Sequence, residues 1–90
     1  MKRVHLFISG YVQGVGFRWY VEGLARRMNI CGFVKNLRDG RVEVVAEGDD
    51  NLIAQFLQEL KEGSFKGYIE EVRKVEEGYQ GEYPDFSITF

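Results

Sequence analysis

A glycine-rich segment, Gly10-Tyr11-Val12-Gln13-Gly14-Val15-Gly16-Phe17-Arg18, holds the residues of this chain whose types and spacing best suit chemistry. Three glycines within seven positions allow positive φ angles and a close approach to a ligand, so several backbone N–H groups can face one concavity. A helix beginning directly after the segment would add its own unpaired N–H groups and its positive dipole end. Arg18 would lie on the first turn of that helix, where its planar guanidinium can bind two phosphate oxygens at once. The segment therefore predicts a site for a phosphoryl group.

The elements on either side of this segment must position it. Val4, Leu6 and Ile8 alternate with other side chains, which predicts a half-buried strand that runs into Gly10. Apolar residues recur at helical spacing from Phe17 onward and predict a helix that ends near Asn29. The segment thus connects a strand to a helix.

The rest of the chain supplies three more strands, a second helix and a short last strand. Asp39-Gly40, between alternating runs at 32–37 and 42–47, is typical of a hairpin. Asp49 and Asp50 are candidates for capping a helix that continues to Gly63. A strand is expected over 68–79, with a bulge between Val72 and Val75, and a terminal strand over 86–90.

The order β-α-β-β-α-β, plus a short C-terminal strand, predicts an α+β fold for a single domain, residues 1–90. It is the ferredoxin-like split βαβ sandwich, an antiparallel sheet with two helices on one face. Right-handed crossovers make the first two strands parallel, with the third between them. Their carboxyl ends then lie at the same sheet edge, roughly 10 Å apart. We therefore expect Asn36, near the end of the second strand, to lie at the same edge as the glycine-rich segment.

The segment Gly10–Arg18, followed by Gly32-Phe33-Val34-Lys35-Asn36-Leu37-Arg38-Asp39-Gly40 and Val42-Glu43-Val44, resembles the acylphosphatase family over essentially the whole chain. The resemblance implies a hydrolase that converts acyl phosphates to a carboxylate and inorganic phosphate, with no metal and no cofactor. In the family, the loop backbone cradles phosphate, the arginine after the Gly-Phe pair binds the phosphoryl group, and the strand asparagine orients the attacking water. Carried over by position, the catalytic residues are Arg18 and Asn36, and the phosphate-binding backbone is that of Gln13, Gly14, Val15, Gly16 and Phe17.

The chemistry of an acyl phosphate suits these residue types. It is a mixed anhydride with a good leaving group, so hydrolysis needs positioning and charge stabilisation more than a strong nucleophile. Charge on the equatorial phosphoryl oxygens can be matched by N–H donors and a guanidinium. The amide oxygen of Asn36 can accept a hydrogen bond from water. No general base is evident beside Asn36, and the resemblance implies that the bound phosphate itself takes the proton.

Plainer interpretations of the same residues stay open. Glycines are common in tight strand-to-helix turns that bind nothing, and the Lys-Ser/Thr ending of a Walker loop is absent here. Arg18 can pair with Glu22 at i, i+4, and both roles are compatible if Glu22 orients the guanidinium from behind. Trp19 either lines the pocket or covers the loop, and Asn36 by itself would be read as a polar residue beside a hairpin.

Composition excludes several classes of protein. Ninety residues with 44% hydrophobic content form one core, and no leader or membrane-spanning pattern is recognisable, so we expect a cytoplasmic monomer that binds no membrane. The one cysteine, Cys31, and the one histidine, His5, leave no disulfide framework, cysteine-based metal site or histidine cluster. Cys31 is expected to be a small buried residue and His5 a spacer without a catalytic role.

The net charge of −2 is unevenly distributed along the chain. Residues 1–41 carry eight Lys/Arg and two acids, and residues 42–90 carry four and twelve. Either the charges interleave in the folded protein, or the first half is electropositive and steers a small anion to the loop. The overall acidity disfavours nucleic acid as a partner.

Two other functions remain in competition. An RNA-binding domain of this topology would carry aromatic residues on its central strands, where this chain has Glu43 and Glu47. The stronger rival is a noncatalytic acylphosphatase-like module that binds phosphate or regulates a larger assembly. The expected partners of the enzyme are a small acyl phosphate as substrate and inorganic phosphate as product or inhibitor. Release of phosphate from a simple acyl phosphate, with Arg18→Ala as control, separates the two.

Overall fold

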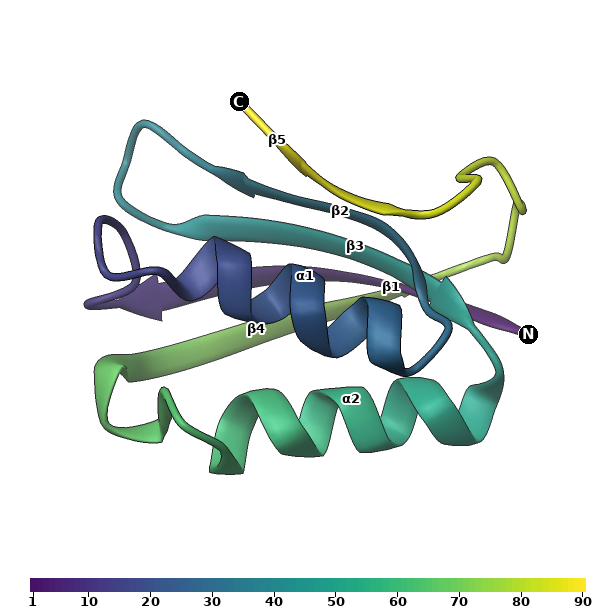
Figure 1. Cartoon of the computed structure of the whole chain (residues 1–90), viewed down its shortest axis with the longest axis horizontal. Coiled ribbons are helices and arrows are strands. Elements are labelled where there is room, and N and C mark those ends of the chain that lie inside the picture. Colours follow the sequence, from purple (N-terminus) through teal and green to yellow (C-terminus); the bar gives the residue numbers. More distant parts are fainter.

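Strands and helices follow one another in the predicted order, and the computed structural model describes all of residues 1–90 (Figure 1). The strands are β1 (Lys2–Gly10), β2 (Cys31–Asn36), β3 (Val42–Gly48), β4 (Ile69–Glu77) and β5 (Phe86–Thr89). The helices are α1 (Phe17–Arg27) and α2 (Asp50–Glu62), and a short 3-10 helix, η1 (Lys66–Tyr68), precedes β4. The predicted ferredoxin-like α+β fold is confirmed.

The sheet has the strand order β4-β1-β3-β2-β5. As predicted, β3 lies between β1 and β2 and is antiparallel to both. The prediction of a fully antiparallel sheet is wrong at one edge, because β5 pairs in parallel with β2, with Gly32 opposite Phe86 and Lys35 opposite Thr89. The sheet is therefore mixed.

The path of residues 78–85 explains the direction of β5. β4 ends beside the start of β1, with Glu77 opposite Arg3, and the chain then crosses the sheet end to reach the start of β2. The buried Glu47 on β3 holds this crossing, since its Oε2 accepts hydrogen bonds from the backbone N–H of Gln80 at 2.8 Å and of Gly81 at 3.3 Å. From that end, β5 can only run in the same direction as β2.

Both helices cover one face of the sheet. Val4, Leu6 and Ile8 of β1 are fully buried in one cluster with apolar side chains of α1 and α2, as their alternation predicts. Asp49 caps α2 as predicted, accepting hydrogen bonds from the N–H groups of Asn51 at 2.9 Å and Leu52 at 3.4 Å. Neither helix has the length and apolar content needed to cross a membrane.

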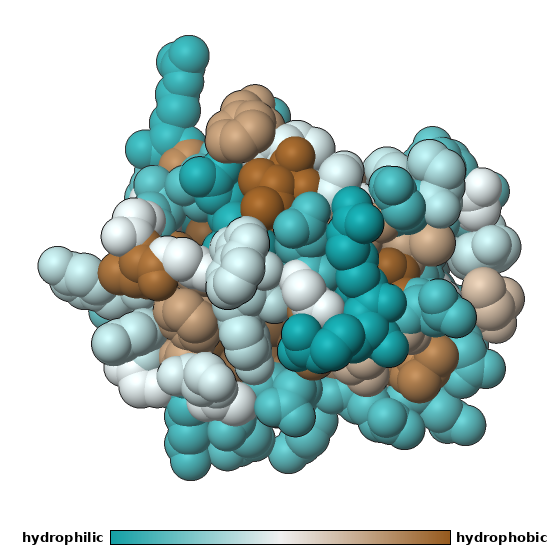
Figure 2. Space-filling view, viewed as in Figure 1, coloured by the Kyte–Doolittle hydropathy of each residue, from teal (hydrophilic) through white to brown (hydrophobic).

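One end of the molecule collects the segments that matter for the site. The loop between β1 and α1, the β2–β3 hairpin, η1 and the end of β5 all lie at this end, on the left of Figure 1. In the space-filling view of the same face, a hydrophobic patch reaches the surface there beside hydrophilic side chains (Figure 2). The predicted bulge in β4 is also displaced toward this end, since the register shift lies opposite Ser9 and Gly10 rather than between Val72 and Val75.

Candidate active site

The loop that precedes α1 presents a row of free backbone N–H groups. Gly14 and Gly16 have φ angles of +75° and +84°, and a Cβ on either would meet no atom within 4 Å. Gly16 also caps α1, without any side-chain cap. The N–H groups from Gly14 to Trp19 donate to no other backbone group. The glycine conformation and the helix start thus leave these donors without backbone partners, as an anion site requires.

Gly10 serves another purpose than the sequence suggested. Its φ is +130°, and a Cβ there would lie 2.2 Å from the backbone oxygen of Tyr68. The neighbouring N–H of Tyr11 donates to that same oxygen at 2.7 Å. Gly10 therefore lets β1 pack closely against η1, and only two of the three glycines shape the loop.

Arg18 lies beside this loop in a small hollow. The hollow has a volume of about 170 Å³, and the backbone of Gly14 and Gly16 lines it together with Arg18. The guanidinium carbon lies 5.0 Å from the centre of the Phe90 ring, which is within reach of a cation–π interaction. Arg18 takes part in none of the ion pairs of the molecule. The charge of Arg18 is therefore available to a ligand.

The pairing of Glu22 with Arg18, one of the two interpretations of Arg18 left open by the sequence, is not formed. Glu22 instead lies 3.6 Å from the guanidinium of Arg26, one helical turn further along α1. An acid that precedes its basic partner by four residues is the more favourable order in a helix, and it is the order of this pair. Nothing orients Arg18 from behind by an opposite charge.

Asn36 ends β2 at the same end of the sheet. It lies two residues beyond Val34 and so on the helix-covered side, and the register of β2 with β5 places it next to the strand end that leads to Phe90. Its Oδ1 is buried and has no hydrogen-bond partner within the protein. A buried acceptor without a partner is costly, so it is suited to receive a hydrogen bond from a bound molecule. Phe90 and Arg18 line the hollow together, whereas Asn36 does not itself line it.

The side chain of Gln13 ties the loop to the hairpin, a role that the sequence did not indicate. Its Nε2 donates to the backbone oxygens of Leu37 at 2.7 Å and Arg41 at 2.9 Å. These residues also close the hairpin through a hydrogen bond from the Leu37 N–H to the Arg41 oxygen at 2.8 Å. Because Leu37 follows Asn36, Gln13 fixes the position of the loop relative to Asn36. The sequence feature that could have indicated this link is the presence of an amide side chain in an otherwise glycine-rich turn.

Carboxylates with shifted pKa values lie outside this hollow. In the hairpin, hydrogen bonds from the backbone and side chain of Arg41 lower the pKa of Asp39. On β4, a hydrogen bond from Arg3 lowers the pKa of Glu77, and one from Lys2 lowers the pKa of Glu76. No group of three or more His, Cys, Asp or Glu side chains is arranged to hold a metal ion. The polar groups at the hollow are thus backbone N–H donors and one guanidinium.

Known proteins resemble this chain along its whole length. The family profile described as Acylphosphatase matches residues 4–88. A protein named Acylphosphatase from Syntrophobacter fumaroxidans is 44% identical over 89 residues, covering 99% of this chain and 92% of its own. Another of that name, from Caldanaerobacter subterraneus, is 44% identical over 97% of both chains. The crystal structure of acylphosphatase from Bacillus subtilis superposes with a TM-score of 0.92 at 36% identity, covering 100% of each chain.

Proposed function

This chain belongs to the acylphosphatase family, enzymes that hydrolyse acyl phosphates, and from this premise we propose that Arg18, Asn36 and the loop backbone carry out that hydrolysis. The observation that supports the proposal most is that three kinds of unpaired polar group lie at one end of the sheet. A row of N–H groups without backbone partners and an unpaired guanidinium lie at one hollow, and an unpaired amide oxygen is buried at the same end of the sheet. The first two attract an anion, and the third can hold a water molecule.

The phosphoryl group binds to the backbone N–H groups of Gln13, Gly14, Val15, Gly16 and Phe17 and to the guanidinium of Arg18. The N–H groups are fixed by the loop and the helix start, so they need no rearrangement when charge develops on the phosphoryl oxygens. The guanidinium can contact two of these oxygens at once. Together they stabilise the transition state more than the ground state, because charge accumulates on those oxygens as the reaction proceeds.

The attacking water is held by Asn36. Its Oδ1 accepts a hydrogen bond from the water and thereby directs the water oxygen toward phosphorus. As the bond from that oxygen to phosphorus forms, the bond between phosphorus and the acyl oxygen breaks, and the carboxylate leaves with the electron pair. One proton of the water passes to a phosphoryl oxygen, which accounts for the lack of a general base. The products are a carboxylate and inorganic phosphate.

Release of inorganic phosphate from acetyl phosphate tests the proposal. The purified protein is expected to release phosphate at a rate well above the uncatalysed rate, with inorganic phosphate as a competitive inhibitor. The Arg18→Ala variant is the control, and it is expected to lose activity while keeping its fold, because Arg18 is not part of the buried core. A protein that binds inorganic phosphate and releases none from acetyl phosphate would instead be a noncatalytic module.

A further inference from the structure

The sheet has two edges, and only one of them is protected against pairing with another strand. β4, at one edge, has six charged residues among nine, and charged side chains on an edge strand discourage pairing. β5, at the other edge, reads Phe-Ser-Ile-Thr and has neither a charged residue nor a proline. Figure 1 shows β5 on the outside of the sheet, with no element beyond it. The outer side of β5 is therefore open to a further strand.

The hydrogen bonding of β5 defines which of its backbone groups are free. The N–H of Gly32 on β2 donates to the oxygen of Asp85 at 2.9 Å. Backbone groups of successive residues in a strand point to opposite sides, so every second residue after Asp85 also faces β2. The N–H and oxygen of Phe86 and of Ile88 therefore face outward, where an added strand can form hydrogen bonds with them.

Two unpaired charges lie near opposite ends of β5, on the sheet face that the helices leave open. Asp85 precedes β5 and is exposed, and Lys35 of β2 lies opposite Thr89, at the other end of the strand. Neither Asp85 nor Lys35 takes part in an ion pair. Alternation places both on the same face as Ser87, whereas the buried Phe86 faces the helices. A second copy of β5 running antiparallel would bring each negative end to a positive end.

A hollow and an exposed ring also lie at opposite ends of β5. The hollow, of about 240 Å³, lies at the start of the strand and is lined by Ile30, Pro84 and Phe86 among others. The ring is that of Phe90, which directly follows the strand and is 92% exposed. Its contact with Arg18 of α1 puts it on the helix side of the sheet, where Ile30 and Phe86 belong to the core. Antiparallel copies would thus bring each ring to the hollow of the other copy.

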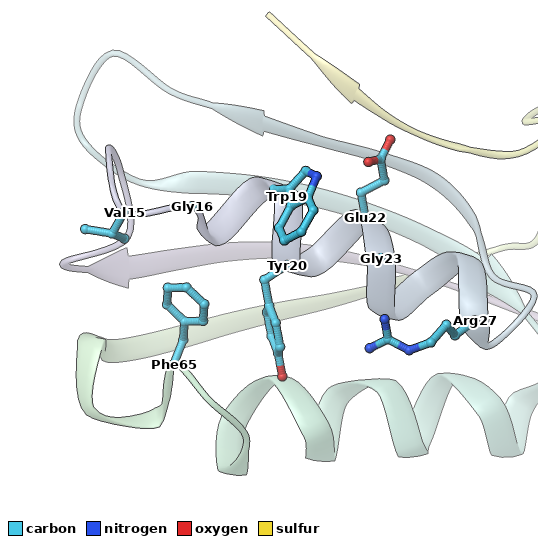
Figure 3. A pocket seen from close by; sticks show the side chains of 8 residues that line it. All are labelled: Val15, Gly16, Trp19, Tyr20, Glu22, Gly23, Arg27 and Phe65. Atoms are coloured by element: carbon cyan, nitrogen blue, oxygen red, sulfur yellow. The ribbon is translucent and has the colours of Figure 1, made fainter.

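The flank of α1 next to β5 is apolar as well. Trp19 is 75% exposed, and it lines the hollow of Arg18 together with Ile88 and Phe90. In Figure 3, Tyr20 extends from α1 toward α2, whereas Trp19 lies away from α2. Exposed aromatic residues of this kind are enriched at interfaces between proteins. A second copy on this edge would therefore cover apolar surface in addition to pairing with the strand.

We propose that two copies of this chain associate through β5, which pairs antiparallel with β5 of the second copy about a two-fold axis. The two sheets then form one continuous sheet, with the helices of both copies on the same face. The composition of the chain suggested a monomer, and the features of this edge favour a dimer instead.

The charges favour one register of the two strands. With Ser87 opposite Ser87 of the second copy, Phe86 of each copy can exchange hydrogen bonds with Ile88 of the other, since both face outward. The same register places Asp85 two strand spacings, roughly 10 Å, from Lys35 of the second copy, a span that the two side chains can bridge. A shift by two residues would instead place Asp85 beside the C-terminal carboxylate, a like charge.

Sedimentation equilibrium of the purified protein over a range of concentrations tests the proposal. The wild type is expected to reach twice the mass of one chain as the concentration rises. Ser87→Lys places two positive charges opposite each other and is expected to raise the dissociation constant at least about tenfold. Val75→Lys is the matched control, because it adds the same charge to the same face of the sheet at the β4 edge, and its dissociation constant should match the wild type.

Two further experiments test the register. Asp85→Lys is expected to raise the dissociation constant about tenfold or more, and adding Lys35→Asp to it should return the constant close to that of the wild type. In a Cys31→Ser background, Ser87→Cys should form a disulfide between copies under mild oxidation, because Cα atoms of such a directly opposed pair lie about 4.5 Å apart. Thr89→Cys, about 13 Å from its counterpart in this register, should stay unlinked.

A wild type that stays monomeric at every concentration would overturn the proposal and leave the edge to a strand of another protein. A dimer whose dissociation constant is unchanged in folded Ser87→Lys and Asp85→Lys, with no disulfide in Ser87→Cys, would overturn pairing through β5. Far-UV circular dichroism shows whether each variant is folded. If Ser87→Lys does not fold, the charge exchange and the disulfide decide.

Discussion

Asn36 carries one of the two buried side-chain oxygens without a hydrogen-bond partner, the other being Oε1 of Glu47. Its Oδ1 is buried and accepts no hydrogen bond from the protein. If it holds the attacking water, Asn36→Ala should lower kcat about 100-fold, the usual cost of losing one positioned polar group. The inhibition constant of inorganic phosphate should hardly change, because the proposed phosphate ligands are the loop and Arg18 and do not include Asn36.

Steady-state kinetics together with phosphate inhibition check this expectation. Asn36→Asp is a useful companion, since it keeps an acceptor oxygen but adds a negative charge near the phosphoryl group, and it should weaken phosphate binding. Full turnover by Asn36→Ala would contradict the role assigned to Asn36.

Arg18 differs from Asn36 in that its loss should affect binding and turnover together. The guanidinium lines the hollow and has no acidic partner, so removing it removes charge and a two-point contact. Arg18→Ala should lower kcat/KM about 100-fold or more, and Arg18→Lys should restore only a small part, because a lysine lacks the planar fork. Kinetics of both variants at equal ionic strength measure this, and wild-type kcat/KM in Arg18→Lys would show that charge alone suffices.

Among the elements, the β1–α1 loop and the β2–β3 hairpin carry the residues of the proposed site, and we expect the contact between them to hold that site together. Gln13 makes this contact through two hydrogen bonds to hairpin oxygens. Gln13→Ala should lower the free energy of unfolding by about 1–3 kcal/mol, because two hydrogen bonds worth about 0.5–1.5 kcal/mol each are lost. The oxygens of Leu37 and Arg41 keep the N–H donors of Gly40 and Leu37. It should also lower kcat/KM, because loop and Asn36 are then no longer held in register.

A cap at the other end of the molecule provides the matched control. Asp49→Ala removes two hydrogen bonds at the start of α2, far from the loop in Figure 1, and should cost about 1 kcal/mol of stability. Its kcat/KM should match the wild type. Equal kinetic losses in the two variants, measured beside urea unfolding, would mean that Gln13 acts only through stability.

Local patterns and topology rules predicted the elements and the pairing of β1, β2 and β3, but not the direction of β5. Burial of one face of a strand or helix leaves a periodic pattern of apolar residues that can be read from a short stretch of sequence. The alternation of Val4, Leu6 and Ile8 and the helical spacing after Phe17 are patterns of this kind. The parallel direction of β5 depends on the crossing held by Glu47, a contact between residues more than thirty positions apart. No sequence pattern near residue 86 indicates this contact.

The candidate site was likewise predicted in part from the sequence. The loop, Arg18 and Asn36 could be singled out because their residue types are recognisable and the topology places them at one end. The sequence could not predict that Glu22 pairs with Arg26 rather than with Arg18, since both arginines lie four residues away from Glu22. The contact of Arg18 with Phe90 was equally hidden, because it depends on the direction of β5.

For the whole molecule, folding brings the oppositely charged halves of the sequence together. Arg3 contacts the carboxylates of Glu47, Glu77 and Glu82, and Nε2 of His5 lies 2.6 Å from Glu43. These groups lie on strands β1, β3 and β4 and on the crossing after β4, which shows that the charges interleave here, one of the two outcomes considered from the sequence. Steering of a small anion by the remaining positive charge stays a prediction.

This network makes stability depend on pH in the acidic range. The pKa values of Glu77, Glu76 and Asp39 all lie below the ordinary values of 4.5 for glutamate and 3.8 for aspartate, chiefly through hydrogen bonds from Arg3, Lys2 and Arg41. A carboxylate with a lowered pKa in the folded state contributes stability above its unfolded pKa and loses it as the pH falls through the folded pKa. The urea midpoint should therefore be level from pH 7 to about 5 and fall below about 4.5 as these groups take up protons.

Glu77→Gln assigns part of this fall to one carboxylate. The variant should be less stable than the wild type at pH 6, and the difference should shrink toward pH 3, where the wild-type carboxylate is itself protonated. Glu71→Gln is the matched control, because Glu71 lies on the same strand and forms no ion pair, and its urea midpoint should follow the wild-type curve at every pH. A stability difference for Glu77→Gln that stays constant from pH 6 to pH 3 would show that lost packing, rather than the ionised carboxylate, accounts for it.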